Sequence, residues 1–411
     1  MNHDETPDGI THLFAQAVRD REGAFVSSEW QAAATPDSVR LTYGFPFAES
    51  FPNEDLLAAA ESLLETDPEH ALQYGGGEAS ARLPDIVARR SRECGIECTE
   101  GEVVLTNGSM NAIDLACRAF LDPGDVVFLE APTFVWSLSV IRNHGVEIVG
   151  FDVDSNGVDV DALAAELEER RRTGRQLPTL FYTIPNFQNP TGMTLSRSRR
   201  DRLLDLAAEY DFLVLEDDAY GELRYDGLDV EPLRAIDESG RVIHAGTFSK
   251  VIGPGIRTGW IIADDPVANR LDTLQTGGPN VFTRGLLTTY CDAGHLDAAV
   301  PRLREAYQQR RDHMLKCLER HMPASADWAE PDGGFFVWVA LPPTVDTRTM
   351  LEDAGQAGVV YLPGESFYAT ETGGEHCLRL SFSHVPLDEM ERGIEALAET
   401  VEVYMDGNRR E

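Results

Sequence analysis

One stretch, residues 246–260, holds the side chains best suited to covalent chemistry. It reads GTFSKVIGPGIRTGW, with Lys250, an arginine seven residues later and four glycines. Of the 35 basic residues only Lys250 and Lys316 are lysines, and the other 33 are arginines. A lysine amine can lose its proton and condense with a carbonyl compound, whereas a guanidinium stays charged. We therefore expect Lys250 to form a Schiff base on a loop that approaches a phosphorylated ligand. A chance surface lysine is the alternative.

A second stretch predicts an anion site. A short strand at residues 102–106 is followed by a turn and a helix start that contain Gly108, Ser109 and Met110. The free N–H groups and the positive dipole end of a helix N-terminus attract phosphate. Together with Lys250 and Arg257, this stretch predicts a phosphate-binding cup.

Two charged patterns lie next to apolar strands. The run FLVL at 212–215 leads into EDDAY at 216–220. In so acidic a chain a carboxylate run is usually a solvated face, but this one stands at the exit of a buried strand. Arg379 lies within the apolar sequence LRLSF. Burying an arginine is costly unless it meets an anion, so we expect it to bind a carboxylate in a bidentate fork. A structural salt bridge is the alternative.

These residues need a scaffold, and the pattern of the chain indicates one. Strands alternate with helices, which is typical of an α/β fold with a mostly parallel sheet. The expected strands are 126–130, 147–151, 178–183, 212–215 and 242–245, and the expected helices between them include 159–173 and 196–210. The turn NPTG at 189–192 follows a strand, where open α/β sheets bind ligands. A long helix at 298–322 then leads to strands 335–341 and 377–382 and helices 347–357 and 387–402.

The chain is strongly acidic: 70 acidic against 35 basic residues give a formal net charge of −35. Nucleic acid and anionic membranes would be repelled, so we expect neither as a partner. At about 1 M salt the screening length falls to ~3 Å, and exposed charges then hardly repel one another. The acid excess leads to the hypothesis that the protein works in a salt-rich cytosol.

Other features favour a cytoplasmic location and no metal. No apolar run approaches the ~20 residues needed to span a bilayer. The acidic start MNHDETPDG lacks the basic and apolar regions of a signal peptide. The cysteines show no metal-ligand spacing, so we expect reduced, mostly buried thiols. They are Cys94, Cys98, Cys117, Cys291, Cys317 and Cys377.

Taken together, these motifs resemble those of the fold-type I aminotransferases of class I and II, which use pyridoxal phosphate. The chain is most similar to the branch with aminoadipate and kynurenine aminotransferases. The resemblance runs from about Gly44 to about Leu397 and rests on several motifs in the expected order. They are the entry GFPF at 44–47, NPTG at 189–192, the D-x-x-Y spacing at 217–220, SKVIGPGIRTGW at 249–260 and LRLSF at 378–382.

The resemblance implies an aspartate aminotransferase-like fold. Its large domain has a mostly parallel seven-stranded sheet sandwiched by helices, and a smaller α+β domain accompanies it. The expected parts are an N-terminal arm at 1–45 that joins the small domain, a cofactor-binding domain at 46–297, and a linking helix with the small C-terminal domain at 298–411.

The resemblance also gives the motifs catalytic roles toward pyridoxal 5'-phosphate. Lys250 would hold the cofactor and move the proton at the substrate's Cα. Asp217, rather than Asp218, would pair with the protonated ring nitrogen. Tyr220 and Asn189 would bond the phenolic oxygen.

Further residues would bind the cofactor's ring, its phosphate and the substrate. The ring and phosphate contacts would come from Phe134, Gly108, Ser109, Met110, Thr247, Ser249 and Arg257, and from Tyr74 across a dimer interface. Arg379, Asn189 and Gly44 would receive the substrate. Plainer alternatives are a core position for Phe134, a loop anchor for Tyr74 and a turn glycine for Gly44.

These expectations describe a homodimeric aminotransferase with shared active sites. It would move an amino group between an L-amino acid and a 2-oxo acid by a ping-pong mechanism. The same apparatus serves β-lyases and decarboxylases, and some similar chains are ligand-sensing regulators. Only about 40 residues precede Gly44, too few for a DNA-binding module, and the acidic charge opposes DNA. Residues 27–31, SSEWQ, depart from the sequence that the family usually has in this arm, which helps form the substrate mouth. We therefore expect a broad range of aromatic, branched or aminoadipate-like substrates.

Overall fold

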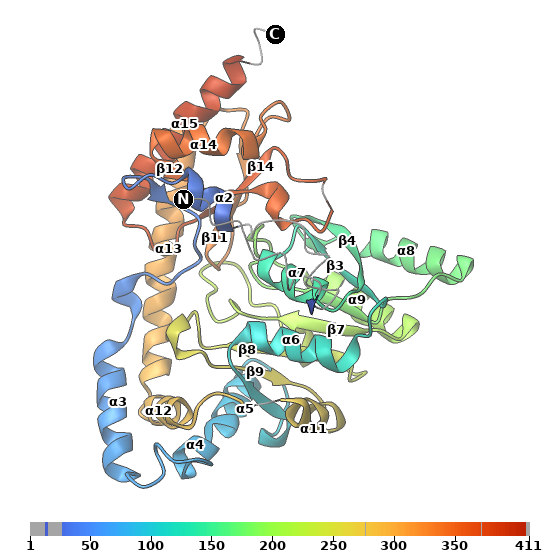
Figure 1. Ribbon diagram of the computed structural model, residues 1–411, viewed down its shortest axis with the longest axis vertical. Helices are drawn as coiled ribbons and strands as arrows, with labels where there is room; N and C mark the ends of the chain where they lie inside the picture. The colour runs from blue at the N-terminus through green and yellow to red at the C-terminus, as the bar shows by residue number, and fades with distance from the viewer. Residues whose placement is uncertain (1–12, 15–26, 276, 371, 408–411) are drawn as a thin grey trace.

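The structure, a computed structural model, describes residues 13–14, 27–275, 277–370 and 372–407 (Figure 1). The N-terminal arm was expected at residues 1–45, and most of its first 26 residues lie outside the described ranges. The described part of the arm lies beside the C-terminal part of the chain. Helix α2 (Ser27–Ala33) packs against α14 (Thr347–Ala357), and strand β1 (Val39–Arg40) pairs in parallel with β12 (Val359–Val360).

One eight-stranded sheet organises the larger part of the molecule. Its order is β2 (Val103–Thr106), β9 (Gly259–Ile262), β8 (Val242–Thr247), β7 (Leu213–Asp217), β6 (Leu180–Thr183), β3 (Val126–Ala131), β4 (Glu147–Asp154) and β5 (Gly157–Val158). The run from β8 to β4 is parallel, β9 and β5 pair antiparallel with its two ends, and β2 pairs antiparallel with β9. The predicted mainly parallel sheet is confirmed, and the two-residue β5 adds an eighth strand to the expected seven.

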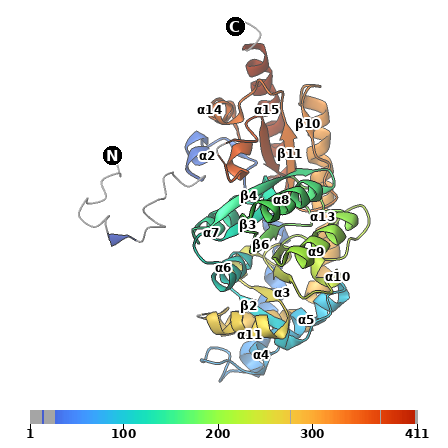
Figure 2. The same cartoon turned by 90° about the vertical axis from the view of Figure 1, so that its right-hand side faces the viewer.

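Helices cover both faces of this sheet, and its central strands are accordingly buried on both faces: every residue of β6 and β8 is buried, and all but one residue of β3 and of β7. In β3, Val127 and Leu129 pack in one cluster with α6, α7 and α11, whereas Val126 and Phe128 pack with α8 and α9 on the opposite face. Figure 2 shows α6 and α7 on one side of the sheet and α9 and α10 on the other. The helices of the two layers are α6 (Ser109–Phe120), α7 (Val135–Arg142), α8 (Val160–Thr173), α9 (Arg197–Tyr210), α10 (Leu233–Ile236) and α11 (Asp265–Leu274).

A smaller antiparallel sheet forms the second part, as predicted. Its order is β10 (Asp327–Trp328), β11 (Phe336–Ala340), β14 (Cys377–Ser381) and β13 (Leu362–Pro363). Helix α14 and α15 (Leu387–Gly407) share a core with this sheet, in which Val337 and Leu380 lie with Met350 and Ile394.

A long helix, α13 (His295–His321), belongs to both parts. With 27 residues it is about 40 Å long. Tyr307 packs in a cluster of the larger part, and Met314 and Leu318 pack in the core of the smaller part. The predicted linking helix at 298–322 is therefore present, and one rigid element connects the two hydrophobic cores.

The remaining helices are grouped around α12 (Val281–Asp292), which also contacts α13. They are α3 (Asn53–Thr66), α4 (Glu78–Ala81) and α5 (Leu83–Glu93), with the 3-10 turns η2 (Ala48–Ser50), η3 (Glu100–Glu102), η4 (Pro254–Ile256) and η5 (Gly364–Phe367) elsewhere. Among the described residues, no helix combines the length and apolarity that a membrane crossing requires.

The parallel strands carry the predicted residues to one edge. Phe134 follows β3, Asn189 follows β6, Asp217 ends β7 and Lys250 follows β8. These four strands are neighbours in the order β3, β6, β7, β8. Their carboxyl ends therefore meet, which is the position where open α/β sheets bind ligands.

Candidate active site

Lys250 stands at the centre of this edge. Its Nζ donates a hydrogen bond to the carbonyl oxygen of Gly44 at 2.9 Å and lies 5.5 Å from the ring centres of Tyr220 and Phe335. Burial and, after it, the positive charge of Arg379 lower the pKa of Lys250 to about 8. An amine with such a pKa is partly neutral near physiological pH, so it can act as a nucleophile or accept a proton.

Asp217 is buried at the end of β7, with 4% of its surface exposed. Its Oδ2 accepts a hydrogen bond from the Tyr182 hydroxyl at 2.8 Å, whereas Oδ1 has no partner among the described residues. Burial raises the pKa of Asp217 to about 6. A buried oxygen without a donor costs free energy. Oδ1 is therefore suited to a ligand that brings a proton toward it.

Arg379 is buried in the middle of β14. Its Nη1 donates to Asn189 Oδ1 at 2.7 Å, and Nη2 donates to the carbonyl oxygen of Thr42. Its guanidinium lies 4.0 Å from the ring centre of Phe336 and 5.0 Å from that of Phe367. Burial lowers the pKa of Arg379 to about 9. Among the described residues no carboxylate pairs with it, so this guanidinium is available to an anionic ligand.

Tyr220 and Asn189 reach the same point from the loops after β7 and β6. Both are buried, and burial raises the pKa of the Tyr220 hydroxyl. Asn189 precedes Pro190 through a cis peptide bond in the NPTG turn. The structure thus brings six of the predicted residues into one cluster: Lys250, Asp217, Tyr220, Asn189, Arg379 and Gly44.

Gly44 is a position where a side chain would not fit. A Cβ placed there would lie 2.4 Å from Cζ of Phe336, well inside van der Waals contact. Phe336 is the ring on which Arg379 rests. The glycine therefore lets the backbone lie against this ring while its carbonyl oxygen meets Lys250.

The predicted phosphate residues gather beside Lys250. Gly108 precedes α6 with φ 86°, and a Cβ on it would lie 2.8 Å from a guanidinium nitrogen of Arg257. Arg257 donates from Nη2 to the carbonyl oxygen of Asn107 at 2.8 Å. Ser109 and Met110 are the first residues of α6.

The hydroxyl groups of Thr247 and Ser249 lie next to each other at the end of β8. Thr247 Oγ1 lies 2.9 Å from Ser249 Oγ and 3.2 Å from the carbonyl oxygen of Thr258. Both side chains are buried. The donors of an anion site, namely hydroxyls, a guanidinium and a helix N-terminus, are thus present on adjacent segments.

Phe134 and Tyr74 differ in their burial. Phe134 precedes α7 and packs, partly buried, against the apolar cluster that contains Tyr182. Tyr74 lies in the segment between α3 and α4, and its side chain is 98% exposed. The single chain does not bring Tyr74 to Lys250.

Sequence reasoning missed several neighbours of the site. Tyr182 and Ser137 stand behind Asp217, and Phe336 and Phe367 flank Arg379. Tyr182 and Phe336 lie in the strands β6 and β11 and Ser137 lies in helix α7, where the apolar pattern makes them look like core positions, whereas Phe367 ends the 3-10 turn η5. The register of the sheet reveals the contact between Tyr182 and Asp217. Tyr182 pairs with Leu215, two residues before Asp217, so the side chains of Tyr182 and Asp217 share a face of the sheet.

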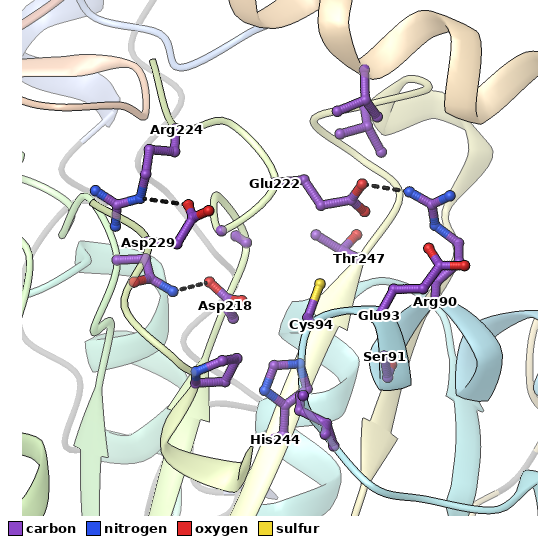
Figure 3. A pocket seen from close by; sticks show the side chains of 18 of the residues that line it. Arg90, Ser91, Glu93, Cys94, Asp218, Glu222, Arg224, Asp229, His244 and Thr247 are labelled. Carbon is purple, nitrogen blue, oxygen red and sulfur yellow. Dashed lines mark hydrogen bonds and ion pairs between the residues drawn. The ribbon is translucent and has the colours of Figure 1, made fainter. Parts of the chain in front are cut away.

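A separate cavity of about 680 Å³ lies between α5, α13 and the ends of β7 and β8 (Figure 3). Asp218, His244, Cys94 and Glu222 contribute to its lining, and Thr247 is the single predicted site residue among the lining residues. His244 also bonds Glu216 at 2.9 Å. Asp218 and Glu216 point away from Asp217 because neighbouring residues of a strand face opposite sides.

All six cysteines are free, and five of them are buried, as predicted. One group with metal-binding chemistry exists among the described residues, formed by His313, Cys317 and Glu391 between α13 and α15. Its atoms already have other partners: His313 Nε2 contacts the carbonyl oxygen of Leu387 at 2.9 Å, and Arg320 pairs with Glu391. We assign no metal to this group.

Comparison with known proteins places this chain in a family. A family model described as aminotransferase class I and II matches residues 45–397. The aromatic-amino-acid aminotransferase 1 of Thermococcus litoralis is 40% identical over 375 residues, covering 90% of this chain and 89% of that protein. The chain therefore belongs to the class I and II aminotransferases and is an aminotransferase by this membership.

Two solved structures agree with this assignment. Pyrococcus horikoshii kynurenine aminotransferase, in complex with PMP, has a TM-score of 0.90 and 36% identity, covering 96% of this chain and 98% of that one. Thermus thermophilus LysN, an alpha-aminoadipate aminotransferase complexed with N-(5'-phosphopyridoxyl)-L-leucine, has a TM-score of 0.86 and 29% identity, covering 96% and 99%. The family and these neighbours point to pyridoxal phosphate chemistry. Their names do not favour a β-lyase, a decarboxylase or a regulator.

Proposed function

We propose that this chain uses pyridoxal 5'-phosphate to move an amino group between an L-amino acid and a 2-oxo acid by a ping-pong mechanism. The observation that carries the proposal is the convergence of Lys250, Asp217 Oδ1 and the guanidinium of Arg379; among the described residues Oδ1 has no donor and the guanidinium has no carboxylate partner. These groups match an aldehyde, a protonated ring nitrogen and a substrate carboxylate, in that order.

The residues present fit the cofactor. Asp217 Oδ1 is buried without a donor, and a protonated pyridine nitrogen would provide one. Gly108 keeps the space beside Arg257 open, and Thr247, Ser249 and the first N–H groups of α6 add donors for a phosphate. Phe134 would supply an aromatic face for the ring, and Ser109 and Met110 would supply backbone donors.

When bound, the cofactor supplies an aldehyde for covalent attachment and a ring that accepts electrons from the substrate's Cα. Lys250 would hold it through Nζ and, once released by the incoming amine, would move the proton at Cα. Its lowered pKa of about 8 suits that task. Asp217, ionised above its pKa of about 6, would keep the ring nitrogen protonated. Tyr220 and Asn189 would bond the phenolic oxygen.

Arg379 would bind the α-carboxylate of the substrate. Its two ring neighbours, Phe336 and Phe367, fix the plane of the guanidinium, and its Nε has no partner among the described residues. A planar guanidinium of fixed orientation binds a carboxylate in two parallel hydrogen bonds. Gly44 would border the same pocket.

The assembly and the setting form the outer part of the proposal. We expect a cytoplasmic homodimer with shared sites, in which the exposed Tyr74 bonds the cofactor phosphate of the neighbouring subunit. The domain limits at residues 45/46 and 297/298 also stay predictions.

Mixing Tyr74→Ala chains with Lys250→Ala chains tests whether the two subunits share their active sites, because one site of each mixed dimer would hold both wild-type residues. Activity that stays at the level of the separate variants would contradict it.

The substrate class is an aromatic, branched or aminoadipate-like amino acid. The names of the relatives support aromatic, kynurenine and aminoadipate substrates. A panel containing phenylalanine, tyrosine, kynurenine, leucine, 2-aminoadipate and aspartate tests it, with 2-oxoglutarate as acceptor and the 2-oxo acid products measured. We expect transfer from the first five at rates well above that from aspartate. No product from any donor, at a level above that of Lys250→Ala protein, would refute the proposal.

A further inference from the structure

Among the residues that the structure describes, Tyr182 is the one side chain that forms a hydrogen bond with the carboxylate of Asp217. Its hydroxyl lies 2.8 Å from Asp217 Oδ2 and 2.8 Å from Ser137 Oγ. Tyr182 and Ser137 are both fully buried, at 0% exposure. Ser137 comes from α7, three residues after Phe134, whereas Tyr182 comes from β6. Two elements thus converge behind one carboxylate.

The chemistry of the three groups sets the direction of the hydrogen bonds. An ionised carboxylate can only accept, and a tyrosine has one proton. Tyr182 must therefore donate to Asp217 Oδ2, and Ser137 must donate to the tyrosine oxygen. This arrangement occupies one oxygen of Asp217 and leaves the other, Oδ1, without a donor.

We infer that Tyr182, supported by Ser137, is the positioning residue of Asp217: it fixes Oδ2 so that Oδ1 alone faces the ligand. The inference rests on the proposed function for the identity of that ligand, a protonated ring nitrogen. The Tyr182 bond is also a donor that stabilises the ionised form of a buried acid. Without it, Asp217 could rotate, and its proton would leave at a higher pH.

Other charged and titratable groups interact electrostatically with Asp217 from the surrounding elements. They are Asp218 in the same segment, His244 on β8, Glu130 on β3, Lys250 and Tyr220. Among the described residues, none of them forms a hydrogen bond with Asp217. The substitution of Tyr182 therefore tests a contact that no neighbour duplicates.

The first experiment uses the cofactor-free full-length chain. The side-chain carboxyl carbons of aspartate are labelled with 13C, and Asp217 is assigned by the loss of its signal in Asp217→Asn. Tyr182→Phe removes one oxygen and keeps the ring. We expect the titration midpoint of Asp217 to rise by about 1 to 2 pH units, because a hydrogen bond to a charged group contributes about that much. Tyr290→Phe is the matched control, since Tyr290 is equally buried and its hydroxyl has no partner among the described residues.

The second experiment uses the loaded enzyme. In Tyr182→Phe the pKa that defines the acid limb of the kcat–pH profile should rise by the same amount. The midpoint of the pH titration of the bound cofactor's absorption should shift with it. The KM for the amino acid should change less than twofold, because Arg379 and Asn189 are untouched. Ser137→Ala, which keeps the tyrosine, should give a smaller shift in the same direction.

An Asp217 midpoint that stays in place in Tyr182→Phe, or moves equally in Tyr290→Phe, would overturn the inference. Should Tyr182→Phe fail to fold, the Ser137→Ala titration decides instead, and an unchanged midpoint there is the contrary result. The cofactor-free titration does not depend on cofactor binding. A failure of the proposed function, seen as wild-type protein that binds no cofactor, is therefore a distinct outcome.

Discussion

At the scale of single residues, Asp217 shows a conflict between folding and function. A carboxylate in the core is unfavourable for the protein alone, and burial raises its pKa to about 6. The unfolded chain holds the same proton with a pKa near 3.9. The folded state thus binds this proton more tightly, so the contribution of Asp217 to stability is greatest below pH 4 and is lost as pH rises through 6.

This conflict predicts that Asp217→Asn stabilises the cofactor-free protein. At pH 8 the variant should be more stable by about 1 to 3 kcal/mol, because it removes the ionisation penalty of a buried acid. At pH 4 the difference should vanish. Melting curves of both proteins at the two pH values test this, at constant salt. A variant that is less stable at pH 8 would contradict it, and we expect the same variant to lose orders of magnitude in turnover.

At the scale of elements, the loop at Gly44 and strand β11 depend on each other. Phe336 of β11 fills the space beside Gly44 and supports Arg379. The site therefore depends on a contact between the segment after β1 and the small sheet, far apart in sequence.

Gly44→Ala should displace Phe336 and with it the guanidinium of Arg379. We expect KM for the amino acid to rise roughly tenfold, since small misplacements of a substrate-binding group are costly. Gly101→Ala is the control, because a Cβ there has no neighbour closer than 3.8 Å and its backbone has no positive φ. Steady-state kinetics at saturating cofactor measure both variants, and an equal effect of the two would refute the argument.

The elements also show what sequence can and cannot predict. Helix α14 was predictable at both ends, because Asp346 caps Thr349 N–H and Gly358 ends the helix in the left-handed conformation. Helix α15 runs to Gly407, beyond the predicted end at 402, since no glycine or proline interrupts residues 403–406. Strand β6 was predictable as apolar. That its Tyr182 faces Asp217 depends on the register between β6 and β7, which no local pattern contains.

At the scale of the whole molecule, charge dominates. The net charge of −35 produces repulsion that salt can screen. Ion pairs within the surface, such as Arg172 with Glu169 on α8, offset little of it because exposed pairs contribute at most about 1 kcal/mol.

The salt hypothesis predicts a melting temperature that rises by roughly 5 °C or more between 0.1 and 2 M KCl. Most of the gain should be complete near 1 M, where screening is already short-ranged, and NaCl should match KCl. Equal melting temperatures and activities in dilute buffer and in molar KCl would show that the acid excess has another origin.

The central claim is that one amine, Lys250 Nζ, holds the cofactor, and the near absence of other lysines makes it directly testable. Purified protein is incubated with pyridoxal 5'-phosphate, reduced with borohydride, digested and mapped by mass spectrometry. The account predicts the cofactor's mass on the peptide with Lys250, none on the exposed Lys316, and no visible absorption band in Lys250→Ala or Lys250→Arg. A peptide with Lys250 that stays unmodified, or a label on Lys316 instead, would contradict it.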